Sequence, residues 1–254
     1  MAYPYQAERY RPSGIGSCAL KQAAGVNGVP MTDEIWSTIW QAELGRAGQD
    51  IALKAFPALG FDIVESIKVE GALPGEIDVI ADPKEWNVLR LPSGEGKDNR
   101  IVGDVKCRNT YAYVHIWKGE DLLAENKDVA IQMNTYMGQA GIDKGMIILL
   151  PFDSAGCRNE LKYNAKRVPN PDISPYIRVF TIDFDPGLFA LTVRRKAELE
   201  MYGLEVAREY DPTRNAFPCT YCSWMQWCRG RDNGGVVITA LPDSGMPMVE
   251  HVIP

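Results

Sequence analysis

Long apolar runs and an excess of positive charge are both missing from this sequence. No run among its 254 residues approaches the roughly 18 to 20 apolar residues that span a bilayer, and the N-terminus has no basic region followed by an apolar stretch. We therefore expect a cytoplasmic protein without a membrane partner. Its 27 basic residues are outnumbered by 33 acidic ones, which gives a net charge of −6. Any binding to nucleic acid must then come from a local positive surface.

A disulfide framework is not expected either, although the chain has six cysteines. Thiols stay reduced in the cytoplasm, so metal binding and simple burial are the roles left for them.

The hydrophobic share of 46% is enough to fill one sizeable core, and no internal repeat is present. One compact body is therefore expected.

The order of apolar patterns predicts an α/β fold with a mixed central sheet flanked by helices. Alternating β-prone runs predict strands at residues 61–69, 76–81, 100–107, 146–152 and 177–184. Helical spacing predicts one helix that begins after Thr32 and two more at residues 120–140 and 186–210. Residues 236–254 show no clear pattern, and we expect them to be loosely ordered.

Two of these helices have an apolar face that is expected to pack on a core. On the first helix the face is formed by Trp36, Trp40, Leu44, Ala47 and Ile51. On the last helix it is interrupted by Arg195 and is formed by Leu188, Leu191, Leu199, Tyr202 and Val206.

Two predicted strands each carry an acidic residue in an otherwise apolar run, namely Asp78 and Asp104. A carboxylate there is costly to bury unless it is paired or binds a metal. Asp104 and Lys106 are two residues apart, so their side chains point to the same face of the sheet. Two carboxylates and a lysine suit Mg²⁺-assisted phosphodiester hydrolysis, with Lys106 acting on the attacking water. A partly exposed ion pair of little energetic value is the alternative.

The helix that follows adds Gln132 and Tyr136, which are four residues apart and therefore share one helical face. Gly-x-x-Asp on one strand, Asp-x-Lys on the next and Gln-x-x-x-Tyr on the following helix closely resemble the RecB-type branch of the PD-(D/E)XK nucleases. The resemblance implies a restriction-endonuclease-like core. It also implies that Gln132 and Tyr136 hold the substrate strand or support the catalytic face.

The resemblance assigns roles to the strand residues as well. It implies that Asp78, Asp104 and the carbonyl of Val105 bind Mg²⁺ or Mn²⁺, and that Lys106 serves the nucleophilic water. One departure concerns the preceding helix, where that branch has a metal-binding histidine four residues after a glycine. The matching position here is Gln49, whose side chain is neutral and is no base. This implies weaker activity or a metal preference shifted toward Mg²⁺.

Three cysteines near the end of the chain, Cys219, Cys222 and Cys228, form a C-x2-C-x5-C pattern. Thiolates this close together select zinc or an iron–sulfur cluster over hard ions. A tetrahedral site needs a fourth ligand, and a structural zinc site usually brings a second close pair, which this sequence does not have. The pattern alone leaves an iron–sulfur cluster, zinc and unligated thiols open.

Cys18, together with the C-x2-C-x5-C pattern after a RecB-type core, resembles the Cas-four family of CRISPR-associated nucleases, which has relatives in phages. The resemblance implies a [4Fe-4S] cluster held by Cys18, Cys219, Cys222 and Cys228 in a small helical region formed by both chain ends. It divides the chain into an N-terminal segment (1–31), a nuclease core (32–185), a C-terminal helix with the cluster segment (186–235) and a tail (236–254).

The function that the resemblance implies is that of a metal-dependent exonuclease on DNA with single-stranded character. It would work in recombination, repair or CRISPR spacer processing, with recombination or CRISPR adaptation proteins as partners. Arg194, Arg195 and Lys196 on the last helix are expected to supply the local positive field for DNA. A DNA-binding or assembly subunit without turnover is the alternative, which Gln49 supports. A zinc-stapled protein-interaction module is the third reading.

Overall fold

A six-stranded sheet lies at the centre of the computed structural model, which describes residues 9–31, 36–91, 99–108, 127–153, 156, 177–211, 219, 222–231, 234–242, 246 and 248–251. The strands follow one another in sequence order across the sheet: β1 (Phe61–Val69), β2 (Gly75–Pro83), β3 (Ile101–Arg108), β4 (Lys144–Pro151), β5 (Arg178–Asp183) and β6 (Met248–His251). β3 and β4 are parallel, and all other neighbours are antiparallel. The expectation of a mixed α/β sheet is therefore confirmed.

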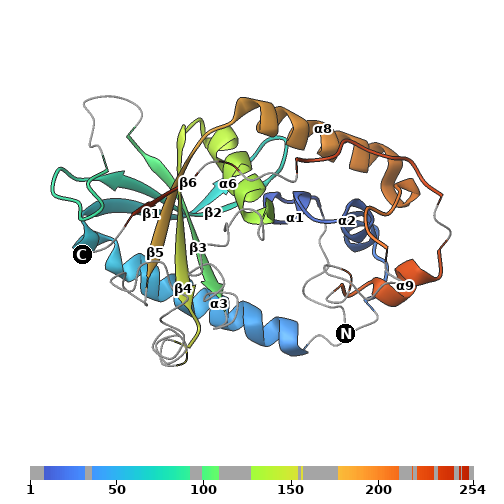
Figure 1. Cartoon of the computed structure of the whole chain (residues 1–254), viewed down its shortest axis with the longest axis horizontal. Coiled ribbons are helices and arrows are strands. Elements are labelled where there is room, and N and C mark those ends of the chain that lie inside the picture. The colour runs from blue at the N-terminus through green and yellow to red at the C-terminus, as the bar shows by residue number, and fades with distance from the viewer. Residues whose placement is uncertain are drawn as a thin grey trace, which may run out of the picture.

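Helices cover both faces of this sheet (Figure 1). On β4, Met146 and Ile148 pack in one core with α3 (Trp36–Ala55), whereas Ile147 and Leu149 pack in another with α6 (Lys127–Ala140). Because side chains alternate between the two faces of a sheet along a strand, β4 contributes residues to two separate cores. α6 also makes the crossover that a parallel β3–β4 pair requires.

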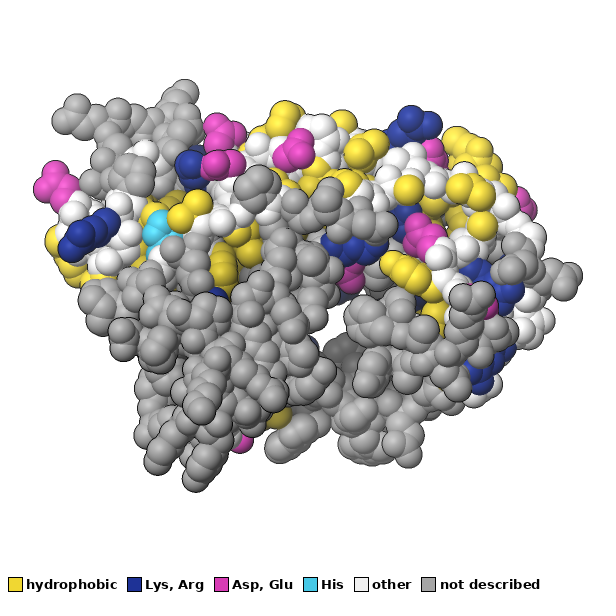
Figure 2. Space-filling view, viewed as in Figure 1, with side chains coloured by type: hydrophobic (Ala, Val, Ile, Leu, Met, Phe, Trp, Pro, Cys, Tyr) yellow, Lys and Arg dark blue, Asp and Glu magenta, His cyan; other side chains and the backbone are white. Residues whose placement is uncertain are grey.

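A third core lies beside the sheet and joins segments from both ends of the chain. It contains residues of α1 (Pro12–Ile15), α2 (Ala19–Val26), α8 (Pro186–Tyr202), the 3₁₀ turns near it and α9 (Met225–Arg229). In Figure 1 this helical group lies to the right of the sheet, and in the space-filling view hydrophobic, basic and acidic side chains are mixed over its surface (Figure 2).

The last helix is shorter than predicted because Gly203 ends it. α8 is capped at its N-terminus by Asp185, whose side chain accepts hydrogen bonds from the backbone N–H groups of Gly187 and Leu188. It ends at Gly203, which has a φ of 49° that favours glycine. The chain then forms the short 3₁₀ turn Gly203–Glu205 and continues in extended form. The predicted helix at 203–210 is therefore wrong.

The predicted apolar face of the first helix is also wrong in its second half. Ile51 is 68% exposed and Ala47 is exposed. The residues that pack on the sheet are Ala52, Leu53 and Phe56. The helix also lies directly against β3 at Gly48, where an added Cβ would be 2.1 Å from Cys107 Sγ.

The tail is ordered where the structure describes it, against the expectation. Val236 bridges to Val206, Ile238 is buried in the third core, and β6 pairs with β5. Long-range pairing of this kind leaves no local signal in the sequence. Within the described residues, no helix combines the length and the apolar character needed to cross a membrane.

Candidate active site and cysteine group

The two acidic residues of the predicted strands meet where β2 and β3 separate. The ladder between these strands ends at the pair Val79–Gly103. Beyond this pair, the backbone N–H of Val105 donates to Asp78 Oδ2 at 3.0 Å instead of to a strand. The N–H and C=O of one strand residue point to the same side, so the Val105 carbonyl is directed to the side of Asp78 as well.

Asp104, Lys106 and Gln132 form a closed ring of hydrogen bonds on the face of the sheet that α6 covers. Lys106 Nζ donates to Asp104 Oδ1 at 2.9 Å and to Gln132 Oε1 at 3.1 Å. Gln132 Nε2 donates to Asp104 Oδ1 at 3.2 Å. The ring holds the ammonium group of Lys106 in one place. It joins the strand residues Asp104 and Lys106 to Gln132 on the helix.

The second oxygen of Asp104 lies outside the ring of hydrogen bonds and is contacted by an ion pair. Asp104 is 2% exposed, yet its Oδ2 accepts no hydrogen bond of normal geometry. Lys106 Nζ lies 2.8 Å from this oxygen, but this contact is an ion pair whose angles are not those of a hydrogen bond. A buried carboxylate oxygen left in this way is suited to a cation.

Asp78 has the electrostatics of a metal ligand. Burial and then the neighbouring Asp104 raise the pKa of Asp78 to about 6, and the Val105 N–H opposes the shift. Two carboxylates that disfavour each other's charge become compatible when a divalent cation binds between them. Asp78, Asp104 and the Val105 carbonyl supply oxygen ligands of the type that Mg²⁺ and Mn²⁺ prefer, and Mg²⁺ keeps several waters besides. These residues therefore fit such an ion.

Tyr136 explains the glycine of the Gly-x-x-Asp motif. A Cβ atom at Gly75 would lie 3.1 Å from Tyr136 Cε1 and 3.1 Å from Pro12 Cδ. Glycine lets the tyrosine ring and α1 approach the strand three residues before Asp78. Tyr136 is 5% exposed, and burial followed by the charge of Asp104 raises its pKa to about 12. It is therefore a neutral supporting group.

Arg108 was not predicted as a site residue, but it lies on the same face of β3 as Asp104 and Lys106. It continues the two-residue spacing of Asp104 and Lys106 along β3. Burial lowers the pKa of Arg108, and the charge of Asp104 opposes this shift. A third charged residue at this spacing was the signal that could have found it.

Gln49 is not part of the hydrogen-bonded ring. It lies partly buried on α3, which packs on the opposite face of the sheet from α6. Next to it, a Cβ at Gly48 would lie 2.1 Å from Cys107 Sγ, so the helix backbone touches β3 directly. Within the described residues, Gln49 forms no hydrogen bond with Asp78 or Asp104. Its role as a ligand stays a prediction.

The four cysteines of the predicted cluster come together from both ends of the chain. Cys18 directly precedes α2, and Cys228 belongs to α9. Burial raises the pKa of Cys219, and so do Cys18, Cys222 and Cys228 in that order. All four are partly buried and free of disulfides. Thiols that influence one another in this way form one electrostatic group.

Basic side chains surround this group of thiols. Burial raises the pKa of Cys228, whereas Arg208 and Arg231 lower it. Burial also raises the pKa of Cys222, and Lys21 lowers it. Four soft donors with nearby positive charge fit an anionic thiolate-ligated metal centre.

Arg195 is a buried structural group, which corrects the expectation that it faces DNA. Its guanidinium is 2% exposed and donates to both carboxylate oxygens of Glu209 at 2.7 and 2.8 Å. It also donates to the carbonyls of Ile15, Ser17 and Thr239. Glu209 in turn accepts from the N–H of Ala19 at 2.7 Å. This pair therefore fixes the backbone on both sides of Cys18.

Arg194 and Lys196, the two neighbours of Arg195 on α8, form ion pairs within the helix instead. Arg194 is exposed and paired with Glu198 at 3.0 Å, and Lys196 is paired with Glu200 at 2.7 Å. Both pairs span one turn of α8 and leave the net charge of that surface near neutral. The predicted positive field of this stretch is therefore weaker than its three basic residues suggested.

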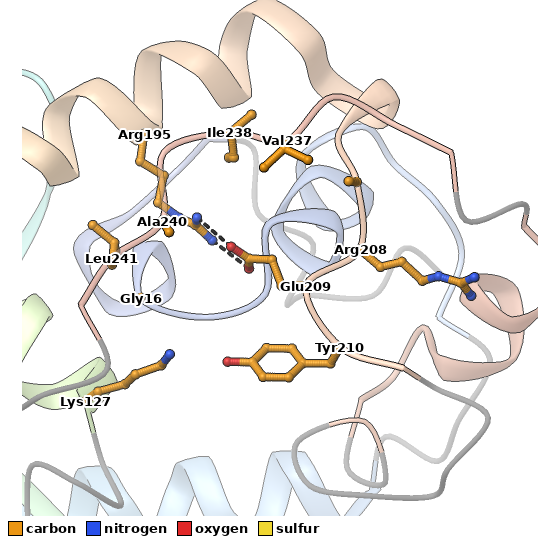
Figure 3. A pocket seen from close by; sticks show the side chains of 11 residues that line it. Gly16, Lys127, Arg195, Arg208, Glu209, Tyr210, Val237, Ile238, Ala240 and Leu241 are labelled. Carbon is orange, nitrogen blue, oxygen red and sulfur yellow. Dashed lines mark hydrogen bonds and ion pairs between the residues drawn. The ribbon is translucent and has the colours of Figure 1, made fainter.

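A pocket of about 310 Å³ lies beside the ion pair of Arg195 and Glu209 (Figure 3). The N-terminal end of α6 and the segments around residues 207–210 and 237–241 surround it. Lys127 and Tyr210 reach toward each other across the pocket, and the Lys127 ammonium lies 6.0 Å from the centre of the Tyr210 ring. The residues that line it are Gly16, Lys127, Arg195, Ala207, Arg208, Glu209, Tyr210, Val237, Ile238, Ala240 and Leu241.

No protein-family model matches this chain, and no curated protein matches it. Among solved structures, the alkaline exonuclease from Laribacter hongkongensis has a TM-score of 0.46 and 13% identity, over 77% of this chain and 90% of that chain. Its complex with dAMP gives the same values. A phage-related exonuclease from Haemophilus somnus 129PT has a TM-score of 0.45 and 15% identity, over 75% and 90%. Likeness at this level assigns neither a family nor a function.

Proposed function

We propose that this chain is a divalent-metal-dependent deoxyribonuclease that removes nucleotides from the ends of DNA with single-stranded character. The observation that carries the proposal is the ring formed by Asp104, Lys106 and Gln132, with Asp78 beside it. The fold does not need the combination of a buried carboxylate (Asp104), a second carboxylate with a raised pKa (Asp78) and a fixed ammonium group (Lys106). They suit phosphodiester hydrolysis.

Asp78, Asp104 and the Val105 carbonyl would hold the Mg²⁺ or Mn²⁺ ion. When bound, this ion supplies charge neutralisation at the phosphate and a more acidic water. Lys106 is held by Asp104 and Gln132, so it orients the attacking water without a large loss of side-chain entropy. The Tyr136 ring lies between α6 and Gly75 of β2 and sets the spacing between this helix and this strand. Arg108 adds positive charge to the same row.

We propose further that Cys18, Cys219, Cys222 and Cys228 hold a [4Fe-4S] cluster. The support for this proposal is that the four thiols, which come from both ends of the chain, form one electrostatic group. Thiolates of this kind select zinc or an iron–sulfur cluster over hard ions. We propose a cytoplasmic role in recombination, repair or spacer processing, alongside proteins of those pathways.

The test uses purified protein kept free of oxygen, and end-labelled single-stranded DNA in linear and circular forms of equal length. With Mn²⁺ or Mg²⁺ the parent should degrade the linear strand and leave the circle intact. Lys106→Ala and Asp104→Asn should lose cleavage by more than about 100-fold, as expected for groups that act on the nucleophile. Lys144→Ala, a matched exposed lysine paired with Asp183, should cleave like the parent.

Full activity in Lys106→Ala would refute the site. Binding of DNA by the parent without cleavage in either metal would favour the second candidate, a DNA-binding or assembly subunit. The position of Gln49 outside the ring is the observation that favours this candidate.

A further inference from the structure

The pocket between Lys127 and Tyr210 has a composition unlike the rest of the chain. Its lining includes three basic side chains, Lys127, Arg195 and Arg208, and one acidic side chain, Glu209. The whole chain has a net charge of −6. Because Arg195 is paired with Glu209, Lys127 is the basic side chain that reaches into the pocket.

The polar and apolar sides of the pocket are separate. The carboxylate of Glu209 is already held by Arg195 and by the N–H of Ala19, so it accepts little from a ligand. The opposite wall is apolar and is formed by Val237, Ile238, Ala240 and Leu241. Tyr210, which is half-buried, extends its ring into the space, while the Arg208 side chain points toward α9 (Figure 3). An aromatic ring, an apolar wall and one inward-facing cation suit a nucleobase with its phosphate.

The pocket also lies on the helix that carries the active site. Lys127 and Gln132 are five residues apart on α6, which is about 7.5 Å along the helix axis and about 140° around it, so the pocket and the ring are reached from different faces of this helix. A volume of 310 Å³ is at the lower end of the range for small-ligand pockets, which starts at about 300 Å³.

We propose that this pocket binds one nucleotide of the single-stranded substrate, with its base stacked on Tyr210 and its phosphate contacted by Lys127. The proposal rests on the proposed function, because it assigns the pocket to the same strand that the active site cuts. The Lys127 ammonium points into the pocket and lies 6.0 Å from the centre of the Tyr210 ring, at the outer limit of a cation–π contact.

Binding is measured without a divalent metal, so that no strand is cut. The full chain, kept free of oxygen, is titrated with a fluorescein-labelled single strand of twenty thymidines in EDTA, and anisotropy is read at several salt concentrations. Tyr210→Ala should weaken binding about 5- to 150-fold, the range for loss of one stacked base. Tyr210→Trp should retain affinity within about threefold, because it keeps a stacking surface.

Lys127→Gln tests the phosphate contact. The slope of log affinity against log salt should fall in magnitude by about 0.7, as expected for the loss of one phosphate contact on a single strand. The matched control is Lys144→Gln, an exposed lysine beyond the other end of α6, which should leave the slope unchanged. An unchanged slope in Lys127→Gln, or parental affinity in Tyr210→Ala, overturns the proposal.

A measurement on the unaltered protein covers the case in which a variant does not fold. A strand carrying 5-iododeoxyuridine is crosslinked by light, and the attached peptide is identified by mass spectrometry. Attachment at Tyr210 supports the pocket, and attachment only at other segments overturns it. Saturation by dAMP without competition from the strand would assign the pocket to a free nucleotide instead and overturn the strand-binding proposal.

The two proposals fail in different ways. A protein that binds the strand through Tyr210 but does not cut it in any metal contradicts only the nuclease. A protein that cuts DNA while Tyr210→Ala binds the strand like the parent contradicts only the pocket.

Discussion

Arg195→Met removes the group that ties both ends of the chain together. The parent guanidinium donates five hydrogen bonds, two to Glu209 and one each to the carbonyls of Ile15, Ser17 and Thr239. Methionine fills a similar space but leaves the Glu209 charge without its partner. Removal of one partner from a buried ion pair costs about 3–5 kcal/mol, and because the Glu209 side chain is 31% exposed we expect the lower end of this range, about 3 kcal/mol. For a chain of this length, each kcal/mol lowers Tm by about 2–4 °C, so Tm should fall by about 6–12 °C.

The neighbouring arginine is a matched control. The Arg194 side chain is 71% exposed, and its pair with Glu198 spans one helical turn on the surface. Such a pair contributes about 0.3–0.5 kcal/mol, so Arg194→Met should lower Tm by no more than about 2 °C. Thermal unfolding is followed by circular dichroism at one scan rate in the absence of oxygen. Equal shifts in the two variants would refute the structural role of Arg195.

Two further predictions concern the carboxylate and the thiols. Because the pKa of Asp78 is raised to about 6, the folded metal-free protein binds more protons than the unfolded chain between about pH 4 and 6, and loses stability as the pH rises through this window. Asp78→Asn should therefore raise Tm in EDTA at pH 8 and have a smaller effect at pH 5; an equal effect at both would contradict the shift. Cys222→Ser should lower the iron content from about four per chain, as expected for a [4Fe-4S] cluster. Cys107→Ser should not change it, and equal losses would exclude the assigned ligands.

The strands and the ring of the candidate site were within reach of sequence analysis because their signals are local. Each predicted strand lies within two residues of an observed one. A two-residue spacing places Asp104 and Lys106 on one face in any strand, whatever the rest of the fold does. A four-residue spacing does the same for Gln132 and Tyr136 on a helix. The two sets meet because α6 connects β3 to its parallel neighbour.

The remaining features depend on contacts that spacing does not encode. Three consecutive basic residues on α8 face three directions, and only the packing of distant segments decided that Arg195 is buried. The same applies to β6, which finds its partner about 70 residues earlier in the chain. The pocket near Tyr210 is built from five separate segments. No motif within any one of them marks it.

A short segment near the N-terminus connects the active site with the cysteine group. Pro12, at its start, packs against Gly75 beside the Tyr136 ring. Four residues later, a Cβ at Gly16 would lie 2.9 Å from Asp128 Oδ1, so the segment also lies directly on the first turn of α6. Cys18 follows, with its neighbouring backbone held by Arg195 and Glu209. Because interiors this closely packed transmit displacement, the thiol geometry and the position of α6, which carries Gln132 of the candidate site, depend on the same seven residues, 12–18.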